Sequence, residues 1–428
     1  MQRLALALIP IASLAGAEGG WSQSAFANAD GWTTWAARLE IAPRTYVDQV
    51  HSLGEAGSLA ISGNSNAAAC GGWEKRLPVE PGRSYRLVAH YRATSVPTEG
   101  LQVLARADWL RADGARAGQP DYAWQVTAAG EWKRVTMDAP APDGAAAVKL
   151  QLFLQNAPQG TVWWDEISFR PIEPPGPRKV TVAAVNLRPQ GTGSAEESVR
   201  RFLDLVDARV APGADVILLP EGITIVGTGK SYAAVAETIP GPTTSRLAEM
   251  ARKKSAYVVA GIYEREGVAL YNTAVLLDRK GNVAGKYRKV YLPREEIEGG
   301  LTPGNEYPVF TTDFGRVGVM ICWDIQYADP ARALARRGAE LLLVPIWGGN
   351  EVLGKARAIE NRVFVASSGY NYPTYIMDPD GEILSVAREN ASLATATIDL
   401  NRRYVDAWLG DMRGRFMKEL RVDVPANE

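Results

Sequence analysis

The spacing of hydrophobic positions predicts strands in the first part of the chain. Short runs in which apolar and polar residues alternate, such as residues 85–91 and 148–154, are separated by turns rich in Gly and Pro. Alternation with a period of two is typical of strands that bury one face. Several short strands of this kind predict an antiparallel β-sandwich (a jelly roll) over residues 21–170.

Farther along, the pattern becomes strand, helix, strand, and it occurs twice. Apolar runs at residues 216–219 and 341–344 each follow an amphipathic helix, expected near 195–209 and 329–337. Strands that are apolar throughout are typical of sheets covered on both faces. We therefore expect an α/β domain over residues 179–428, with two sheets inside and helices outside.

A proline-rich segment separates the two patterns. Four prolines within residues 170–178 exclude a helix or a central strand there. We expect residues 171–178 to form a stiff linker between two domains. Two domains also suit a chain of 428 residues, which is longer than one hydrophobic core usually serves.

The N-terminus has the composition of a secretory signal peptide. Arg3 precedes an apolar run at residues 4–14 that is too short to span a bilayer, and residues 15–17 (Ala-Gly-Ala) match an A-x-A cleavage site. We expect residues 1–17 to be this signal and the mature protein to be exported, either periplasmic or secreted. No later apolar stretch approaches the length of a transmembrane helix, so the sequence predicts no membrane partner.

Charge and composition exclude several classes of protein. The chain has 47 Lys and Arg against 48 Asp and Glu, a formal charge of -1, which removes the electrostatic case for nucleic-acid binding. Two cysteines and two histidines are too few for a disulfide framework or an ordinary Cys/His zinc site. We expect no metal and no organic cofactor.

Three residues of the second domain offer thiol chemistry without histidine. Both histidines, His51 and His90, precede the linker, so Ser-His-Asp and Cys-His catalysis have no base there. Cys322 follows an apolar run and, taken alone, is more typical of a buried structural thiol. Glu221, at the end of a predicted strand, and Lys289 change this interpretation, because a thiol nucleophile without histidine needs a carboxylate base and a nearby cation.

These charges predict how the thiol would react. If its neighbours lowered the pKa of Cys322, the thiolate fraction at neutral pH would rise. The ammonium of Lys289, together with a backbone N–H such as that of Trp323, could stabilise the oxyanion of a tetrahedral intermediate.

The sequence around these residues resembles the nitrilase superfamily of carbon–nitrogen hydrolases. The matching motifs are Leu-Leu-Pro-Glu221, Tyr-Arg-Lys289-Val-Tyr-Leu and Val-Met-Ile-Cys322-Trp-Asp, within about residues 179–400. The resemblance implies a four-layer αββα sandwich, a homodimer, Cys322 as nucleophile, Glu221 as general base and then acid, and Lys289 as oxyanion stabiliser. Asp324, in Cys-Trp-Asp, is more similar to the amidase and carbamoylase branches than to true nitrilases.

The resemblance also implies a second glutamate shortly before the Cys motif. Glu298 fits its spacing best, and Glu296 is the alternative. Candidates for substrate binding are Trp347, Tyr291 and Asn350. The sequence thus predicts an enzyme that cleaves the C–N bond of a small amide or carbamoyl substrate through a Cys thioester, with acyl transfer to an amine left open.

The first domain resembles galactose-binding-like, carbohydrate-binding jelly rolls in residues 130–135 and 160–169. Nine of the twelve tryptophans precede the linker. Their ring faces could stack on a glycan, but tryptophans more often build the core of such a sandwich. A glycan-binding surface protein with a non-catalytic second domain is therefore the alternative to the enzyme.

Overall fold

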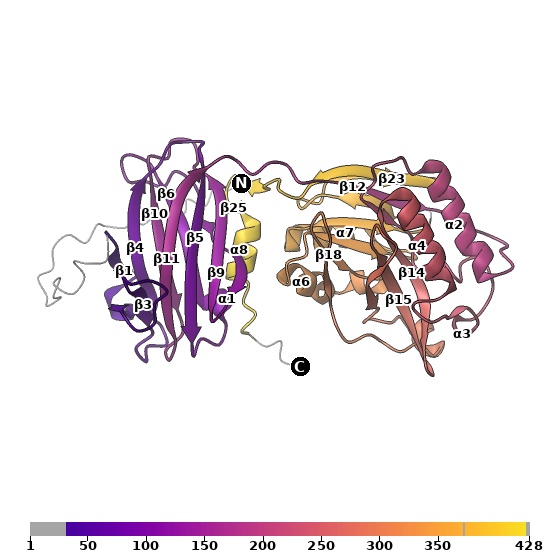
Figure 1. Ribbon diagram of the computed structural model, residues 1–428, viewed down its shortest axis with the longest axis horizontal. Helices are drawn as coiled ribbons and strands as arrows, with labels where there is room; N and C mark the ends of the chain where they lie inside the picture. Colours follow the sequence, from indigo (N-terminus) through magenta and orange to yellow (C-terminus); the bar gives the residue numbers. More distant parts are fainter. Residues whose placement is uncertain (1–30, 371–372, 425–428) are drawn as a thin grey trace, which may run out of the picture.

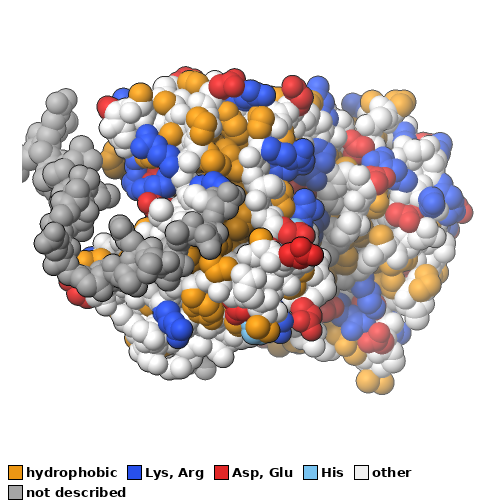
Figure 2. Space-filling view, turned by 60° about the vertical axis from the view of Figure 1, so that its left-hand side comes forward, with side chains coloured by type: hydrophobic (Ala, Val, Ile, Leu, Met, Phe, Trp, Pro, Cys, Tyr) orange, Lys and Arg blue, Asp and Glu red, His pale blue; other side chains and the backbone are white. Residues whose placement is uncertain are grey.

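The computed structural model describes residues 31–370 and 373–424, which form two domains joined by an extended segment (Figure 1). The predicted signal peptide, residues 1–17, lies outside the described residues. Within the described part, no helix has the length and apolar character needed to cross a membrane. Figure 2 shows basic and acidic side chains interspersed over one face, in keeping with the formal charge of -1.

Two antiparallel sheets form the first domain, in the orders β1-β4-β10-β6-β7 and β2-β3-β11-β5-β9-β8. The strands of the first sheet are β1 (Thr33–Ala36), β4 (Cys70–Pro78), β10 (Ala147–Gln155), β6 (Val103–Leu110) and β7 (Asp121–Tyr122). Those of the second are β2 (Arg44–Asp48), β3 (Ser58–Ser62), β11 (Thr161–Ile172), β5 (Ser84–Thr94), β9 (Trp132–Pro140) and β8 (Gln125–Ala129).

The inner faces of these sheets share one hydrophobic core. Because side chains alternate along a strand, Leu87 and Ala89 of β5 lie in the same core as Leu150 and Leu152 of β10. Most tryptophans of this domain are buried rather than displayed: Trp32, Trp73, Trp109, Trp132, Trp163 and Trp164. Their burial favours a packing role over sugar stacking.

Two six-stranded sheets form the second domain, in the orders β16-β15-β14-β13-β12-β23 and β17-β18-β19-β20-β21-β22. The strands of the first sheet are β16 (Val283–Arg288), β15 (Ala269–Leu277), β14 (Tyr257–Glu266), β13 (Val216–Leu218), β12 (Lys179–Asn186) and β23 (Ser392–Asp399). Those of the second are β17 (Val309–Thr311), β18 (Arg316–Val319), β19 (Leu341–Pro345), β20 (Phe364–Ser368), β21 (Thr374–Met377) and β22 (Ile383–Ala387).

These two sheets pack face to face, and helices cover their outer faces. Leu218 of β13 and Leu343 of β19 belong to the core between the sheets. Helices α2 (Ala195–Arg209) and α4 (Pro242–Lys254) pack on the outside of the first sheet, and α6 (Ala328–Arg336) and α7 (Glu351–Asn361) pack on the outside of the second. The layers therefore follow the order helix, sheet, sheet, helix. Each sheet has a parallel centre, β12-β13-β14 and β18-β19-β20.

The C-terminal segment returns to the first domain. After β23 the chain forms β24 (Val405–Asp406), β25 (Gly410–Asp411) and α8 (Met412–Glu419), and α8 contacts β7 and α1 (Glu99–Gln102) (Figure 1). Arg403 pairs with Asp121 of β7 and with Asp411. Residues 405–419 thus pack with the sandwich, although their sequence continues from the second domain.

Candidate active site

Glu221 lies just beyond the carboxyl end of β13, and the residue is only 2% exposed. Its Oε1 atom accepts hydrogen bonds from Lys289 Nζ at 2.9 Å and from Asn272 Nδ2 at 2.7 Å. The hydroxyl of Tyr370 donates to the main-chain carbonyl of Glu221. The carboxylate is therefore held from its backbone and from its side chain.

Lys289 follows β16 and is 1% exposed. Its Nζ atom lies 2.9 Å from Glu221 Oε1 and 2.9 Å from Glu296 Oε2. Burial alone would lower the pKa of Lys289, but the charges of Glu221, Cys322 and Glu296 hold that pKa well above its ordinary value. The site therefore contains a buried, permanently charged ammonium group.

The second glutamate in this cluster is Glu296, and the expectation for Glu298 is corrected. Glu296 is 4% exposed and lies on α5 (Arg294–Glu298), whereas the side chain of Glu298 is 62% exposed and pairs with Arg294. Residues two positions apart on a helix point to different sides, so only one of the two glutamates can face Lys289. Spacing in the sequence alone could not distinguish them.

Asn272 of β15 joins the two carboxylates, and the sequence reasoning missed it. Its Nδ2 atom donates to Glu221 Oε1 at 2.7 Å and to Glu296 Oε1 at 2.6 Å. Burial raises the pKa of Glu296 to about 7, although Lys289 opposes this, and the charge of Glu221 raises it further. The available signal was the polar pair Asn272 and Thr273 within a mostly apolar strand.

Cys322 begins a 3-10 helix, η3 (Cys322–Gln326), shortly after β18, and has a φ of 41°. This left-handed conformation is uncommon for a residue with a side chain and is found at functional turns. Its Sγ atom lies 3.6 Å from the carbonyl oxygen of Gly348. Burial and then the charge of Glu221 raise the pKa of Cys322 to about 12, despite the opposing charge of Lys289.

The direction of this shift corrects the idea of a preformed thiolate. A thiol with a raised pKa is protonated at neutral pH. The negative charge of Glu221 acts on Cys322, so the carboxylate and the thiol are close neighbours.

Asp324 links the turn of Cys322 to the segment of Lys289. Its buried carboxylate accepts hydrogen bonds from Ile321 N at 2.8 Å, Tyr287 Oη at 2.7 Å and Tyr291 N at 3.0 Å. Because these donors belong to different sheets of the domain, one side chain sets the position of both segments. Burial raises the pKa of Asp324 to about 6.

The remaining candidates differ in where they lie. A Cβ added to Gly222 would meet the ring of Trp347 at 3.5 Å, which places Trp347 beside the Glu221 segment. Trp323 and Trp347 are both partly exposed. Asn350 instead caps α7 by accepting a hydrogen bond from Val352 N at 2.8 Å.

The side chain of Tyr291 is also held by other protein groups. Its hydroxyl donates to Asp329 at 3.2 Å, and its ring stacks on Tyr327 with centroids 4.0 Å apart. The described residues contain no cluster of three or more His, Cys, Asp or Glu side chains that could hold a metal ion.

Comparison with known proteins identifies the second domain. The family profile described as carbon-nitrogen hydrolase matches residues 181–406. Omega-amidase NIT2 of Homo sapiens is 30% identical over 236 residues, covering 48% of this chain and 84% of the relative. Omega-amidase NIT2 of Danio rerio is 32% identical over 249 residues, covering 51% and 86%.

The solved structures that match this chain include that of Saccharomyces cerevisiae Nit3, which is described as a member of branch 10 of the nitrilase superfamily. Nit3 is 22% identical to this chain, with a TM-score of 0.47, and the match covers 52% of this chain and 90% of Nit3. The sandwich lies outside the residues that the family profile matches. The chain therefore belongs to the carbon–nitrogen hydrolase family and is a hydrolase of carbon–nitrogen bonds other than peptide bonds.

Proposed function

We propose that the protein hydrolyses a small amide or carbamoyl compound through a thioester on Cys322. The observation that carries this proposal is the buried cluster of Glu221, Lys289 and Glu296 beside a cysteine in a left-handed turn. Burying three charged groups is costly unless they serve one another or a reaction.

In the first half of the reaction, Glu221 accepts the proton of the Cys322 thiol as sulfur attacks the substrate carbonyl carbon. The new C–S bond turns the carbonyl oxygen into an oxyanion. Lys289 and the backbone N–H of Trp323 stabilise that negative charge, because a cation and an N–H group at the start of a helix both favour an anion. Glu221 then protonates the departing nitrogen as the C–N bond breaks.

In the second half, water attacks the thioester. Glu221 accepts a proton from the water, the oxyanion forms again in the same place, and the C–S bond breaks to release the acid. The thiol recovers its proton from Glu221. Glu296 and Asn272 are positioning residues in this scheme, because they contact Lys289 and Glu221 rather than the reacting atoms.

The names of the relatives favour amides over nitriles. Both NIT2 proteins are described as omega-amidases, and the Cys-Trp-Asp motif points the same way. Export remains part of this proposal on the basis of residues 1–17, and fractionation of cells that express the full chain would test it. The alternative, a non-catalytic glycan-binding protein, gains no support from the buried tryptophans.

Ammonia release from a panel of small amides, carbamoyl compounds and nitriles tests the proposed function. The wild type and Cys322→Ala are compared on the same panel, with folding checked by circular dichroism. We expect release that disappears in the alanine variant and is greatest for an amide or a carbamoyl compound. Release that survives Cys322→Ala would contradict the thioester mechanism, and release from nitriles alone would contradict the substrate class.

A further inference from the structure

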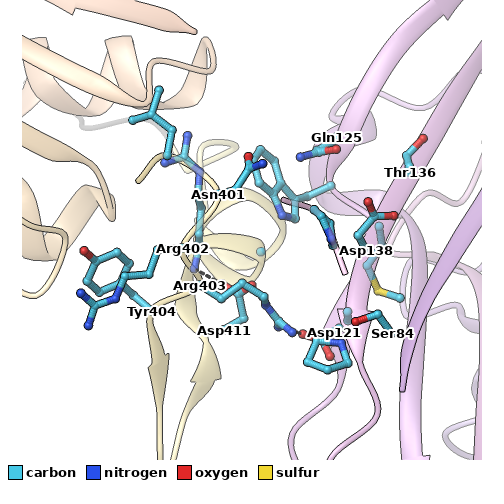
Figure 3. A pocket seen from close by; sticks show the side chains of 18 of the residues that line it. Ser84, Asp121, Gln125, Thr136, Asp138, Asn401, Arg402, Arg403, Tyr404 and Asp411 are labelled. Carbon is cyan, nitrogen blue, oxygen red and sulfur yellow. Dashed lines mark hydrogen bonds and ion pairs between the residues drawn. The ribbon is translucent and has the colours of Figure 1, made fainter. Parts of the chain in front are cut away.

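A cavity lies between the two domains. Its volume is about 740 Å³, within the range of small-molecule sites. Figure 3 shows Gln125, Thr136 and Asp138 of the sandwich on one side, and Arg402 and Tyr404 of the returning segment on the other. The proline-rich linker closes a further part of its wall. The cavity therefore exists only where the sandwich, the linker and the C-terminal segment meet.

This cavity is distinct from the cluster around Cys322. Glu340 and Phe364 line it, and they lie at the amino ends of β19 and β20. Cys322 follows the carboxyl end of β18, which runs parallel to β19. The two sites thus lie at opposite ends of the parallel strands of one sheet. A molecule in the cavity does not touch the reacting atoms.

The cavity is lined by arginines, most of which are neutralised by carboxylates. The paired groups are Arg86 with Asp138, Arg178 with Glu340, Arg362 with Asp380, and Arg403 with Asp121 and Asp411. These pairs hold the walls together, and their charges are already compensated.

Arg402 and Arg413 differ, because neither forms an ion pair with any part of the chain that the structure describes. Arg402 is exposed and lies over the ring of Tyr404 at 4.8 Å. Arg413 lies over the ring of Trp124 at 5.2 Å and donates to main-chain carbonyls of Arg362 and Ala339. Both arginines line the cavity, and the negative charges of Glu340 and Asp411 act on Arg413, so Arg402 is the less compensated of the two.

We propose that this interdomain cavity binds a small carboxylate-bearing molecule, with Arg402 as its main charge partner. The planar fork of a guanidinium group matches a carboxylate in two parallel hydrogen bonds. Ser84, Gln125, Thr136 and Asn401 line the same cavity and offer neutral hydroxyl and amide groups to the rest of the molecule.

Binding there would also couple the two domains. A molecule that contacts both the sandwich and the amino ends of β19 and β20 binds only the docked arrangement, so it stabilises that arrangement in proportion to its occupancy. The site would thereby connect the state of the first domain to the hydrolase without entering the reaction.

Isothermal titration of the full-length chain tests the proposal, with citrate, glucuronate and inorganic phosphate as probes. We expect one of the two carboxylates to bind with a Kd that weakens about tenfold or more in Arg402→Gln, because a charge-assisted hydrogen bond is lost. Arg200→Gln is the matched control, since Arg200 is exposed on α2 and, among the residues that the structure describes, forms an ion pair only with Asp204. Its Kd should equal that of the wild type.

Gln125→Trp provides a second variant, because it fills the cavity from the sandwich side and leaves every arginine in place. We expect it to abolish carboxylate binding while the melting temperature stays close to that of the wild type. Absence of binding by both carboxylates at millimolar concentrations would overturn the proposal. So would tighter binding of phosphate than of either carboxylate, or binding that survives both variants.

Discussion

Replacing Glu296 by Gln would change one carboxylate oxygen of this buried side chain into an amide NH2 group. Glu296 Oε1 accepts from Asn272 Nδ2 at 2.6 Å, and Oε2 lies 2.9 Å from Lys289 Nζ. Both partners are donors, so above about pH 7, where Glu296 is ionised, the change places an amide NH2 group against one of these donors in either orientation of the glutamine amide. The change preserves size and shape and removes one hydrogen bond, which makes it a sharper perturbation than truncation.

The cost follows from burial of the cluster. Leaving a buried donor without an acceptor costs about 1–3 kcal/mol, which corresponds to about 5- to 150-fold in an equilibrium or a rate. Because Glu296 acts by holding Lys289, the loss should fall mainly on the transition state. We expect kcat to fall about 10- to 100-fold, with KM changed less than about threefold.

Glu298→Gln is the matched control, two residues along the same helix. Its side chain is 62% exposed and pairs with Arg294 at 2.8 Å, an interaction worth only a few tenths of a kcal/mol. We expect kcat/KM of this variant to lie within about twofold of the wild type. Steady-state ammonia release from the best amide measures both variants, with thermal melting to verify folding.

Two results would refute this reasoning. If Glu296→Gln keeps the kcat of the wild type, Glu296 does not position Lys289 for the reaction. If Glu298→Gln loses as much activity as Glu296→Gln, the effect belongs to α5 as a whole. An increase in KM at constant kcat would assign Glu296 to uniform substrate binding instead.

Further predictions concern stability and pH. Because burial raises the pKa of Glu296 from 4.5 to about 7, the folded state keeps a proton that the unfolded chain has released. Stability should therefore fall as pH rises through this window, by at most on the order of 3 kcal/mol, and Glu296→Gln should remove that slope in urea unfolding. Asp324→Asn should lower stability by about 1–3 kcal/mol and reduce kcat, because an amide NH2 group would replace an oxygen that accepts hydrogen bonds from Tyr287, Tyr291 or Ile321. Unchanged melting and activity would contradict this. Gly354→Ala places a Cβ 2.0 Å from the hydroxyl of Tyr375 and should destabilise by about 1–3 kcal/mol, whereas Gly100→Ala, with open space, should melt as the wild type does.

Much of the architecture could be predicted from hydrophobic periodicity. Apolar strands such as residues 216–219 and 341–344 become β13 and β19, and the helix expected near 195–209 is α2. Both depend on local spacing, because a strand buried on both faces and a helix buried on one need different patterns. Glu221, Lys289 and Cys322 could also be selected, since each belongs to a distinctive motif.

The arrangement around these residues could not be predicted in the same way. Asn272 and Asp324 contribute through hydrogen bonds to residues far away in sequence, and nothing local marks those partners. The raised pKa of Cys322 likewise reflects burial among groups from other strands. A sequence pattern reports which residue types are present but not how much water surrounds them.

The sequence by itself determined most strands and helices and the motifs that contain the central thiol, lysine and glutamate. It placed the linker at residues 171–178, but residues 171 and 172 belong to β11 and pair with β5 in the sandwich. Only the tertiary structure decided that Glu296 rather than Glu298 faces Lys289, and that residues 405–419 return to the sandwich. The physical reason is that periodicity encodes which face of an element is buried, whereas packing between distant segments decides which atoms meet on that face.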